Sequence, residues 1–299
     1  MSLHVFANIV TPFGTASNNR GETDGNTTTL QKLLWKSSVH TTVSAEAIRF
    51  ALRRQFAEDE DTNRYWDDFK RANSWRDPNF TNWGNDNESK YIDDDLLGFM
   101  RADAGKSEGT AGSVTFRRAV LEITRAVSLT PWNGDVSFNA ASPGATPSAA
   151  KKGQNPVPYG AELHATRYQF GFAMTPERLA DKSRAAKALE AIASLRCVAG
   201  NHSRFLYDFS PEAIVLRITD DPAPRILYCF DTNDGGKSVV ADLLVQKIQT
   251  KDILPDEILV GLSDLNSKLA IQLKETGVGI LGVRAAVKAA SARIHTTLK

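Results

Sequence analysis

A polar loop near the start of the chain and the helix expected after it carry residues suited to binding a sugar–phosphate chain. The loop holds Asn18, Asn19 and Arg20 among glycines, so amide side chains, a guanidinium and exposed backbone amides could contact phosphate and ribose. Arg49 and Arg53 are four residues apart in the expected helix and therefore share one face. A solvated basic helix face beside a surface loop is the alternative interpretation, because charged helix faces are common.

Other polar residues extend this candidate surface, each with an ordinary structural alternative. Ser44 precedes the helix expected over AEAIRFALRRQF and is a preferred N-cap residue, and a helix N-terminus attracts anions. Arg117 and Arg118 are neighbours on an expected strand, so only one of them can join a given surface, and an ion pair at a strand edge fits equally well. His202 and Arg204 lie in the turn AGNHSR, where they could meet a phosphate, although a histidine in such a turn is more often a capping residue.

A low-complexity loop is expected over residues 139–158, NAASPGATPSAAKKGQNPVP. Its only charges are Lys151 and Lys152, and its Ala, Pro and Gly content gives it no core of its own. It is either a disordered surface loop or a flexible arm that clamps a nucleic-acid strand or a neighbouring molecule.

Signals of catalysis and of cofactor or metal binding are weak. The aspartate run 93–95 could hold Mg²⁺, but without further ligands at suitable spacing we interpret it as a solvated or capping patch. The glycines of 277–282 match a dinucleotide spacing, yet the preceding stretch is expected to be helical and few residues follow. GxSxG, HExxH and P-loop patterns are absent. We therefore expect no catalytic residue, no metal and no cofactor.

The charge of the chain is unevenly distributed. With 299 residues, 41% of them hydrophobic and 24% charged, the composition is that of a globular protein with a proper core. The net charge of +1 counts mildly against nucleic-acid binding. However, residues 58–95 hold twelve acidic and five basic residues, a net charge of −7, so the rest of the chain carries +8. Local charge, not the total, sets the field at a binding surface.

Cysteine and hydropathy patterns indicate a cytoplasmic protein. Cys197 and Cys229 have no CxxC neighbour, so we expect buried thiols rather than a disulfide or a zinc site. The start MSLHVFANIV lacks the features of a signal peptide, and no apolar run is long enough to span a membrane. We therefore expect no association with a membrane.

Periodicity predicts an α+β fold interrupted by an insertion. The segment 58–112 is acidic, rich in Asn and holds three of the five tryptophans, so we expect it to project from a core that resumes near Val114. Strands are expected at 3–10, 39–43, 114–129, 164–174, 213–219 and 225–230. Helices are expected at 45–56, at 176–196 after a Thr175 cap, and over most of the C-terminal third.

Several stretches together resemble the DevR family, type I-B-like backbone subunits of CRISPR Cascade complexes, within a wider superfamily of CRISPR RNA-binding proteins. No single motif is decisive, but the stretches occur in the family's order from about residue 3 to about residue 219. They are VFANIVTPFG, NNRGETDGNTTTLQK, TTVSAEAIRFALRR, YIDDDLLGFM, FRRAVLEITRAVSLTPW, NPVPYGAELHATRYQFGF and AGNHSRFLYDFSPEAIVLRIT.

The resemblance implies a modified RRM-like (ferredoxin-like) palm of residues 1–57 and 113–299, helical fingers at 58–112 and a thumb hairpin at 139–159. Members of this family stack as a filament along guide RNA, the crRNA, and the thumb of one copy reaches toward the next. The protein holds the backbone of the guide, so the bases stay free to pair with target DNA. The expected partners are the crRNA, target DNA through the guide, further copies of the chain and other Cascade subunits.

Carried over to this sequence, the resemblance implies phosphate and ribose contacts with little base selectivity. These contacts would come from Asn18, Asn19, Arg20, Ser44, Arg49, Arg53, Arg117, His202 and Arg204, with Lys151 and Lys152 in the thumb. The chain departs from many RRM-like proteins in lacking a recognisable aromatic signature for stacking bases on the sheet. The acidic insertion is also unusual for a protein that coats RNA, and we expect it to face away from the RNA or to repel non-specific nucleic acid.

The sequence is also compatible with two other functions. Related subunits of other CRISPR effectors cut target RNA with a loop aspartate, and Asp24 lies in the corresponding loop, so a metal-dependent ribonuclease is the main alternative. A developmental or transcriptional regulator is suggested only by the name of the family.

Overall fold

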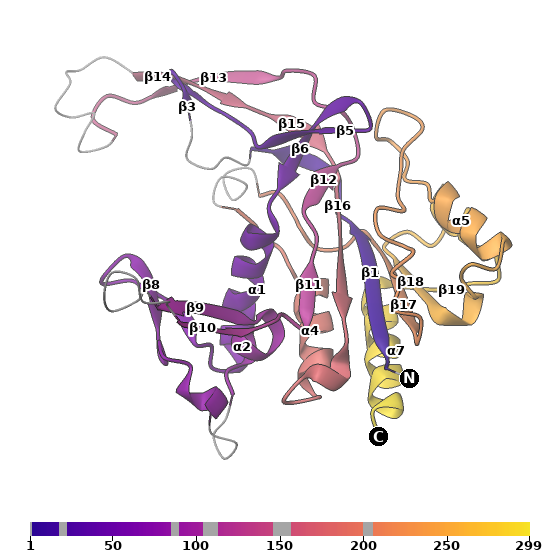
Figure 1. Ribbon diagram of the computed structural model, residues 1–299. Coiled ribbons are helices and arrows are strands. Elements are labelled where there is room, and N and C mark those ends of the chain that lie inside the picture. The colour runs from indigo at the N-terminus through magenta and orange to yellow at the C-terminus, as the bar shows by residue number, and fades with distance from the viewer. Residues whose placement is uncertain (1, 18–22, 85–89, 104–112, 146–156, 200–205) are drawn as a thin grey trace.

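A large mixed β-sheet forms the centre of the computed structural model, which describes residues 2–17, 23–84, 90–103, 113–145, 157–199 and 206–299 (Figure 1). From one edge to the other its strands are β19 (Gly279–Leu281), β18 (Ile258–Leu262), β17 (Ala213–Thr219), β1 (His4–Val10), β16 (Tyr168–Met174), β12 (Ala126–Ser128), β6 (Ser38–Val43) and β5 (Lys32–Trp35), and β11 (Leu121–Ile123) also pairs with β16. β1 is antiparallel to both of its neighbours, with Asn8 opposite Gly171 on one side and Val215 on the other.

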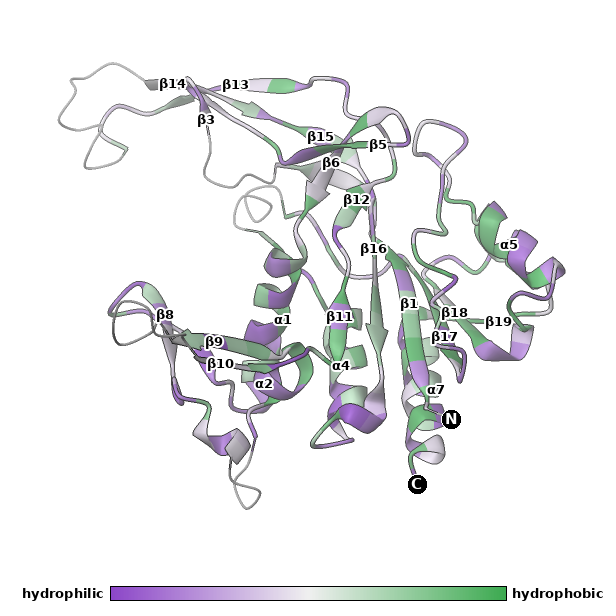
Figure 2. Ribbon diagram, in the orientation of Figure 1, coloured by the Kyte–Doolittle hydropathy of each residue, from purple (hydrophilic) through white to green (hydrophobic). Residues whose placement is uncertain are grey.

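Both faces of the sheet are covered. One face packs against α1 (Ala45–Asp59), α4 (Arg184–Ala193) and α7 (Val283–Thr297). The other packs against α5 (Asp242–Gln249) and α6 (Lys268–Lys274), with η4 (Pro255–Glu257) leading into β18. Residues 5, 7 and 9 of β1 join the first cluster and residues 6 and 10 the second, because side chains alternate along a strand. Figure 2 shows the resulting concentration of hydrophobic residues along β1 and β16.

The insertion between α1 and β11 forms a small body around its aromatic residues. Its elements are β7 (Arg64–Asp67), β8 (Ala72–Trp75), η1 (Thr81–Gly84), α2 (Ile92–Leu97), β9 (Phe99–Asp103) and β10 (Ser113–Arg117). Phe80 stacks on Phe99 with ring centroids 3.9 Å apart, and Trp83 lies 5.9 Å from the same ring. α2 ends at Gly98, whose φ of +67° and close approach to the backbone of Arg117 leave no room for a Cβ atom.

Short strands extend from the opposite end of the central sheet. β13 (Val136–Ala141) and β14 (Val157–Glu162) form a hairpin, and β14 also pairs with β4 (Thr27–Thr28), which pairs with β3 (Thr23–Asp24). β2 (Gly14–Ala16) pairs with β15 (His164–Thr166) below them. Figure 1 shows this group reaching away from the sheet, on the same side of the molecule as β8 but at the other end.

Most of the expected elements are confirmed. The strands at 3–10, 39–43 and 213–219 correspond to β1, β6 and β17, and the helix after Ser44 is α1. The stretch 114–129 forms three short strands, β10, β11 and β12. The helix expected before the glycines of 277–282 is α6, which supports the rejection of a dinucleotide site there.

The strand expected over residues 225–230 is wrong, because this stretch crosses the sheet instead of joining it. The backbone N–H of Tyr228 donates to Asn8 Oδ1 at 2.9 Å, and Gln169 Nε2 donates to the Phe230 carbonyl at 3.0 Å. Gly171 allows this approach, since a Cβ atom there would meet Leu227 at 2.5 Å. We name residues 225–231 the strap.

The single helix expected over 176–196 is also wrong in extent. A 3-10 turn, η2 (Pro176–Arg178), comes first, Thr175 makes no capping side-chain bond, and α4 begins only at Arg184. The loop between them is held by Asp95, which accepts from the backbone N–H groups of Ala180 and Asp181 at 2.9 and 3.1 Å. A distant side chain therefore sets where this helix begins. Among the described residues no helix is both long and apolar enough to cross a membrane.

Candidate nucleic-acid interface

The start of α1 is capped as its sequence predicts. Ser44 follows β6 directly, and its Oγ accepts a hydrogen bond from the backbone N–H of Ala47 at 3.2 Å. Hydrogen bonds to Glu46 from its own backbone N–H and from Ser44, with the nearby charges of Arg49 and Arg125, lower the pKa of the Glu46 carboxyl. Arg49, Arg125 and the ionised carboxyl of Glu46 therefore lie together near the positive end of the helix dipole.

Strand pairing brings Arg125 to this place. β12 is antiparallel to β6 with Ala126 opposite Val43, so Arg125 lies next to Ser44. Its Nη1 donates to Thr42 Oγ1 at 3.3 Å. Arg125 follows Arg117 and Arg118 in the sequence but was not among the contacts implied by the family resemblance. Only the register between two strands distant in the chain puts it at the helix start.

A polar hollow of about 450 Å³ opens beside Arg125. Lys32 in its lining is tied to Glu162, with Nζ 2.6 Å from Oε2, and lies 3.9 Å from the centroid of the Trp132 ring. The hollow thus offers hydroxyl, amide and cationic donors of the kind that meet ribose and phosphate. It is lined by Thr29, Leu30, Gln31, Lys32, Leu33, Thr42 and Arg125.

Arg49 and Arg53, expected to act together, have different surroundings. Arg49 is half-buried, and its Nε has no hydrogen-bond partner among the described residues. Arg53 is tied to the insertion, with Nε 2.9 Å from Asp93 Oδ2. Because a buried donor without an acceptor costs free energy, an anion would be stabilised at Arg49, whereas Arg53 already has an anionic partner.

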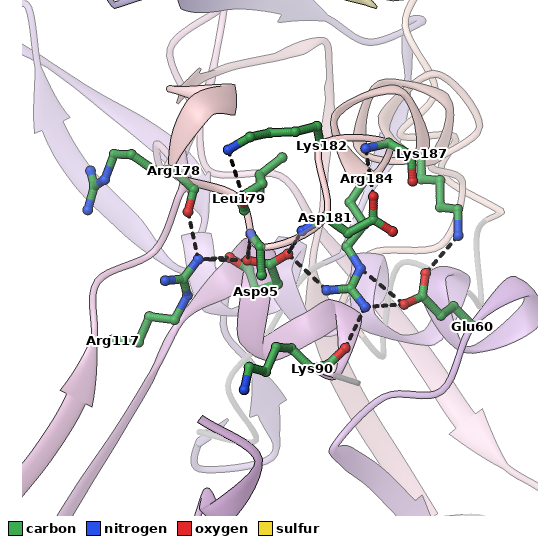
Figure 3. Close-up of polar contacts among 12 residues, drawn as sticks. Glu60, Lys90, Asp95, Arg117, Arg178, Leu179, Asp181, Lys182, Arg184 and Lys187 are labelled. Carbon is green, nitrogen blue, oxygen red and sulfur yellow. Dashed lines mark hydrogen bonds and ion pairs between the residues drawn. The ribbon is translucent and has the colours of Figure 1, made fainter. Parts of the chain in front are cut away.

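Arg117 is likewise engaged inside the protein. Its Nη2 lies 2.6 Å from Asp95 Oδ1 and donates to the Arg178 carbonyl at 2.9 Å (Figure 3). Its guanidinium carbon lies 4.2 Å from the centroid of the Trp83 ring. Neighbouring Arg118 is exposed and pairs with Glu122 at 2.8 Å, as an ordinary surface ion pair. Whether Arg53 and Arg117 also touch nucleic acid stays a prediction.

The aspartate run 93–95, interpreted from the sequence as a solvated or capping patch, is not solvated, although Asp93 and Asp95 do accept from backbone N–H groups. Asp93, Asp94 and Asp95 are at most 2% exposed, and each faces different donors. Asp93 Oδ1 accepts from the backbone N–H of Asn63 at 2.7 Å, and Asp94 Oδ2 accepts from the Asn63 side chain at 2.8 Å. Asp95 Oδ2 lies 2.8 Å from Arg184 Nη1. We name the three carboxylates the aspartate anchor, because they join the insertion to α1 and α4.

Arg184 links the anchor to the end of α1. Its guanidinium also bonds Glu60 and the Lys90 carbonyl, and Lys187 reaches the second oxygen of Glu60 at 2.7 Å (Figure 3). Among the described residues Asp94 forms no ion pair, and its Oδ2 accepts from the Asn63 side chain. Burial, followed by the adjacent charge of Asp93, raises the pKa of the Asp94 carboxyl to about 7.

The acidic residues do not assemble a metal site in the described part of the chain. No group of three or more His, Cys, Asp or Glu residues there is placed to hold a metal ion. Asp24, the candidate residue of the ribonuclease alternative, is exposed in the two-residue strand β3. Cys197 is exposed and Cys229 is buried, so the expectation of two buried thiols holds for Cys229 alone, and neither forms a disulfide.

Seven of the expected contacts fall outside the described residues. Asn18, Asn19 and Arg20 belong to the stretch between β2 and β3, Lys151 and Lys152 to the stretch between β13 and β14, and His202 and Arg204 to the stretch between α4 and β17.

On the sheet face opposite α1, the strap covers the centre, where nucleic-acid bases would otherwise be able to stack. The strap crosses β1 and β16 there, held by Asn8 and Gln169, which also bond each other at 3.3 Å. The amide side chains that an open sheet would present to solvent are used internally. This fits the lack of an aromatic stacking signature on the central strands.

Comparisons with known proteins point to one family. Residues 12–234 match the model of the family described as "CRISPR-associated negative auto-regulator DevR/Csa2". The chain is 55% identical over 303 aligned residues, covering all of both chains, to a Myxococcus xanthus (strain DK1622) protein named "CRISPR-associated protein Cas7/Cst2/DevR".

Solved structures share the fold at low identity. A chain of a "CRISPR RNA-guided surveillance complex" has a TM-score of 0.58 at 15% identity, covering 98% of this chain and 99% of its own. A chain of a "CRISPR RNA-guided surveillance complex, pre-nicking" has a TM-score of 0.60 at 13% identity, covering 97% of this chain and 99% of its own.

Proposed function

The chain belongs to the DevR/Csa2 family of CRISPR-associated proteins, and on that basis we propose that it is a non-catalytic, guide-RNA-binding backbone subunit of a Cascade surveillance complex. The identity of 55% over the full length of a relative named Cas7/Cst2/DevR is the observation that carries this proposal. The crRNA, further copies of the chain, other Cascade subunits and target DNA paired with the guide are its partners, and the cytoplasm is its compartment.

The topology supports a modified RRM-like palm. Reading across the sheet, β17, β1, β16 and β11 stand in the order of a ferredoxin-like βαββαβ unit, with α1 and α4 packed in one cluster on the same face. Residues 1–57 and 113–299 form this palm in our proposal. Residues 58–112 are its fingers, and the hairpin within 139–159 is its thumb.

The guide lies, in this proposal, across the N-terminal end of α1. Arg49 and Arg125 supply cations there, and the polar hollow lined by Thr42 and Lys32 supplies hydrogen-bond donors. Contacts of this kind hold phosphate and ribose and carry little base selectivity. Because the strap covers the sheet, the bases of the guide would not stack on it. This supports the proposal that they remain available for pairing.

The remaining proposed contacts follow the family resemblance. They are Asn18, Asn19, Arg20, Ser44, Arg53, Arg117, His202 and Arg204, with Lys151 and Lys152 on the thumb. For Arg53 and Arg117, a contact would use guanidinium nitrogens other than those bonded to Asp93 and Asp95.

Electron microscopy of the chain expressed with its partner subunits and guides of several lengths tests the proposal. A backbone subunit adds copies as the guide grows, so the particle should lengthen in proportion to the guide. A particle of fixed size, whatever the guide, would contradict a filament along RNA.

The ribonuclease alternative has a separate test. The assembled complex is incubated with RNA complementary to the guide and with Mg²⁺, alongside an Asp24→Ala complex. Intact RNA supports the non-catalytic function, whereas regularly spaced cuts that disappear with Asp24→Ala would replace it.

A further inference from the structure

The β7–β8 hairpin gathers the cations of an otherwise acidic segment. Residues 64–76 contain four of the five basic residues of the segment 58–95 and only two acidic residues. The hairpin therefore has a net charge of +2. One of those carboxylates is engaged locally, because Asp67 pairs with Lys70 at 3.3 Å. Arg71, next to Lys70, is exposed at the turn. The hairpin is therefore a cationic region within a segment of acidic composition.

Aromatic rings are exposed along the same hairpin. Phe69 at the turn is 98% exposed, and Trp66, Trp75 and Tyr65 are 48%, 41% and 37% exposed. Asp67 holds the turn that presents Phe69, since its Oδ1 accepts from the backbone N–H groups of Phe69 and Lys70 at 3.1 and 3.0 Å. A group of exposed rings bordered by polar and charged residues is typical of a surface that binds a partner.

The strand register places two of the tryptophans on one face. Arg64 pairs with Trp75 and Trp66 pairs with Asn73, and directly paired residues of an antiparallel ladder point the same way. Arg64 and Trp66, two residues apart on β7, therefore share their face with Trp75. The Arg64 guanidinium carbon lies 5.6 Å from the centroid of the Trp75 ring. On the other face, Arg76 lies 5.2 Å from the Tyr65 ring.

Hydrogen bonds tie the base of the hairpin to the rest of the insertion. The Arg76 backbone N–H donates to the Asn63 carbonyl at 2.9 Å, and the Asn63 side chain exchanges bonds with the backbone of Asp77 at 2.8 and 3.0 Å. Asn63 is in turn held by Asp93 and Asp94 of the aspartate anchor. Figure 1 shows β8 at the outer edge of the molecule, far from α7. The rings are thus held on a fixed arm that projects from the core.

The geometry points to a second nucleic-acid site on this hairpin, which binds the unpaired bases of a single strand by stacking them on Trp66, Trp75 and Phe69. Aromatic rings interleaved with arginine and lysine are the combination that single-strand binders use, because every base has a stacking face and every linkage has a phosphate. The net positive charge of the hairpin suits such a strand. The site differs from the guide site proposed at the N-terminal end of α1, because it contacts bases instead of the backbone. It does not depend on the function proposed for that site.

Binding of matched oligomers to the purified full-length protein tests the site. Oligothymidylate is compared by fluorescence anisotropy with an abasic oligomer of the same length and charge, and oligouridylate tells whether DNA or RNA is preferred. We expect the base-containing strands to bind about tenfold more tightly than the abasic strand. Equal affinity for all three strands would overturn the stacking site, as would binding of neither base-containing strand.

Variants assign the effect to the hairpin. Trp66→Ala combined with Phe69→Ala should remove the preference for bases and leave the affinity for the abasic strand unchanged, while Trp66→Phe should keep the preference. Phe116→Ala is the matched control, because Phe116 is 71% exposed on the neighbouring strand β10. A preference for bases that survives the double variant, in a protein with an unchanged melting temperature, would contradict the site.

Two further measurements distinguish binding at the hairpin from binding at the N-terminal end of α1. Arg49→Ala lies outside the hairpin, so base-containing strands should still bind more tightly than the abasic strand in this variant. Photo-crosslinking of an iodouracil-substituted strand should label the peptide of residues 64–76. Crosslinks confined to other peptides would assign base contact elsewhere.

Discussion

Arg184 and Asp95 form an ion pair in the interior, with Nη1 2.8 Å from Oδ2 and side chains that are 6% and 0% exposed. The pair joins α4 to α2, and α2 belongs to the insertion, so one contact holds two parts of the chain that are 89 residues apart. Asp95 also receives Arg117, and Arg184 also receives Glu60 (Figure 3). Arg117 and Arg184 thus both help to hold the insertion in place.

We expect Arg184→Met to lower the free energy of unfolding by about 3–5 kcal/mol, because it strands buried Asp95 without its cation. Chemical denaturation followed by circular dichroism measures the loss. Arg118→Ala is the control, since its pair with Glu122 is exposed and should change stability by about 0–1 kcal/mol. Equal losses of unfolding free energy from the two substitutions would show that the buried ion pair stabilises the protein no more than the exposed pair does.

Asp94 gives the stability of the protein a specific pH dependence. Its folded-state pKa of about 7 lies above the ordinary value of 3.8, so the folded state holds this proton more tightly than the unfolded state. The contribution of Asp94 to stability is therefore complete at low pH and is lost as the pH rises through about 7. Asp94→Asn keeps an acceptor for Asn63 but does not titrate.

Thermal melting of both proteins across this pH range measures the effect. The unsubstituted protein should lose stability relative to Asp94→Asn between about pH 5 and pH 8, by about 1–3 kcal/mol. Parallel pH profiles would mean that Asp94 does not titrate in this range.

Arg49→Ala and Arg53→Ala should have separable effects, although the residues share a helix face. Arg49→Ala should weaken binding of single-stranded RNA about threefold to tenfold and lower the salt slope by about one, with little loss of stability. Arg53→Ala should mainly destabilise the protein, because Asp93 loses its ion pair. Anisotropy titrations at several salt concentrations, with melting curves, separate the two.

Arg54 supplies the matched control for Arg49. It is exposed on α1 and lines a different cleft, near the start of α7, so Arg54→Ala should leave the salt slope for RNA nearly unchanged. If Arg54→Ala weakens binding as much as Arg49→Ala does, the groove is not at the N-terminal end of α1.

Deleting residues 142–153 should leave the fold intact and abolish assembly along the guide. The paired residues of the β13–β14 ladder end at Ala141 and resume at Val157, so the deletion spares the ladder and leaves three residues to close it. An unchanged melting temperature with loss of long particles in electron microscopy is the expected result. Particles of normal length would contradict the assignment of this hairpin as a thumb.

Local sequence patterns were sufficient to predict the helices and strands that are determined by residues close to them in the chain. The cap at Ser44, the α1 helix and the buried strands β1 and β17 follow from residue types and spacing within a few positions. The segment 58–112 stands out from the core by its acidic and tryptophan-rich composition, and its assignment as an insertion stays a prediction.

Elements fixed by distant partners could not be predicted in this way. Residues 225–230 look like a strand, but the amides of Asn8 and Gln169 take their backbone groups. The aspartates of 93–95 look solvated, but Arg53, Arg117 and Arg184 reach them from three other elements. Arg125 joins the start of α1 only through the register of β12 against β6.

The most direct test of a guide-RNA-binding subunit is to purify the chain, produced in cells that carry a guide array, and to extract and size any nucleic acid that stays bound. We expect small RNA of one uniform length. Nuclease treatment should not shorten it while the protein holds it, and Arg49→Ala should reduce its amount. Protein that purifies free of RNA, or with fragments of every length, would contradict it.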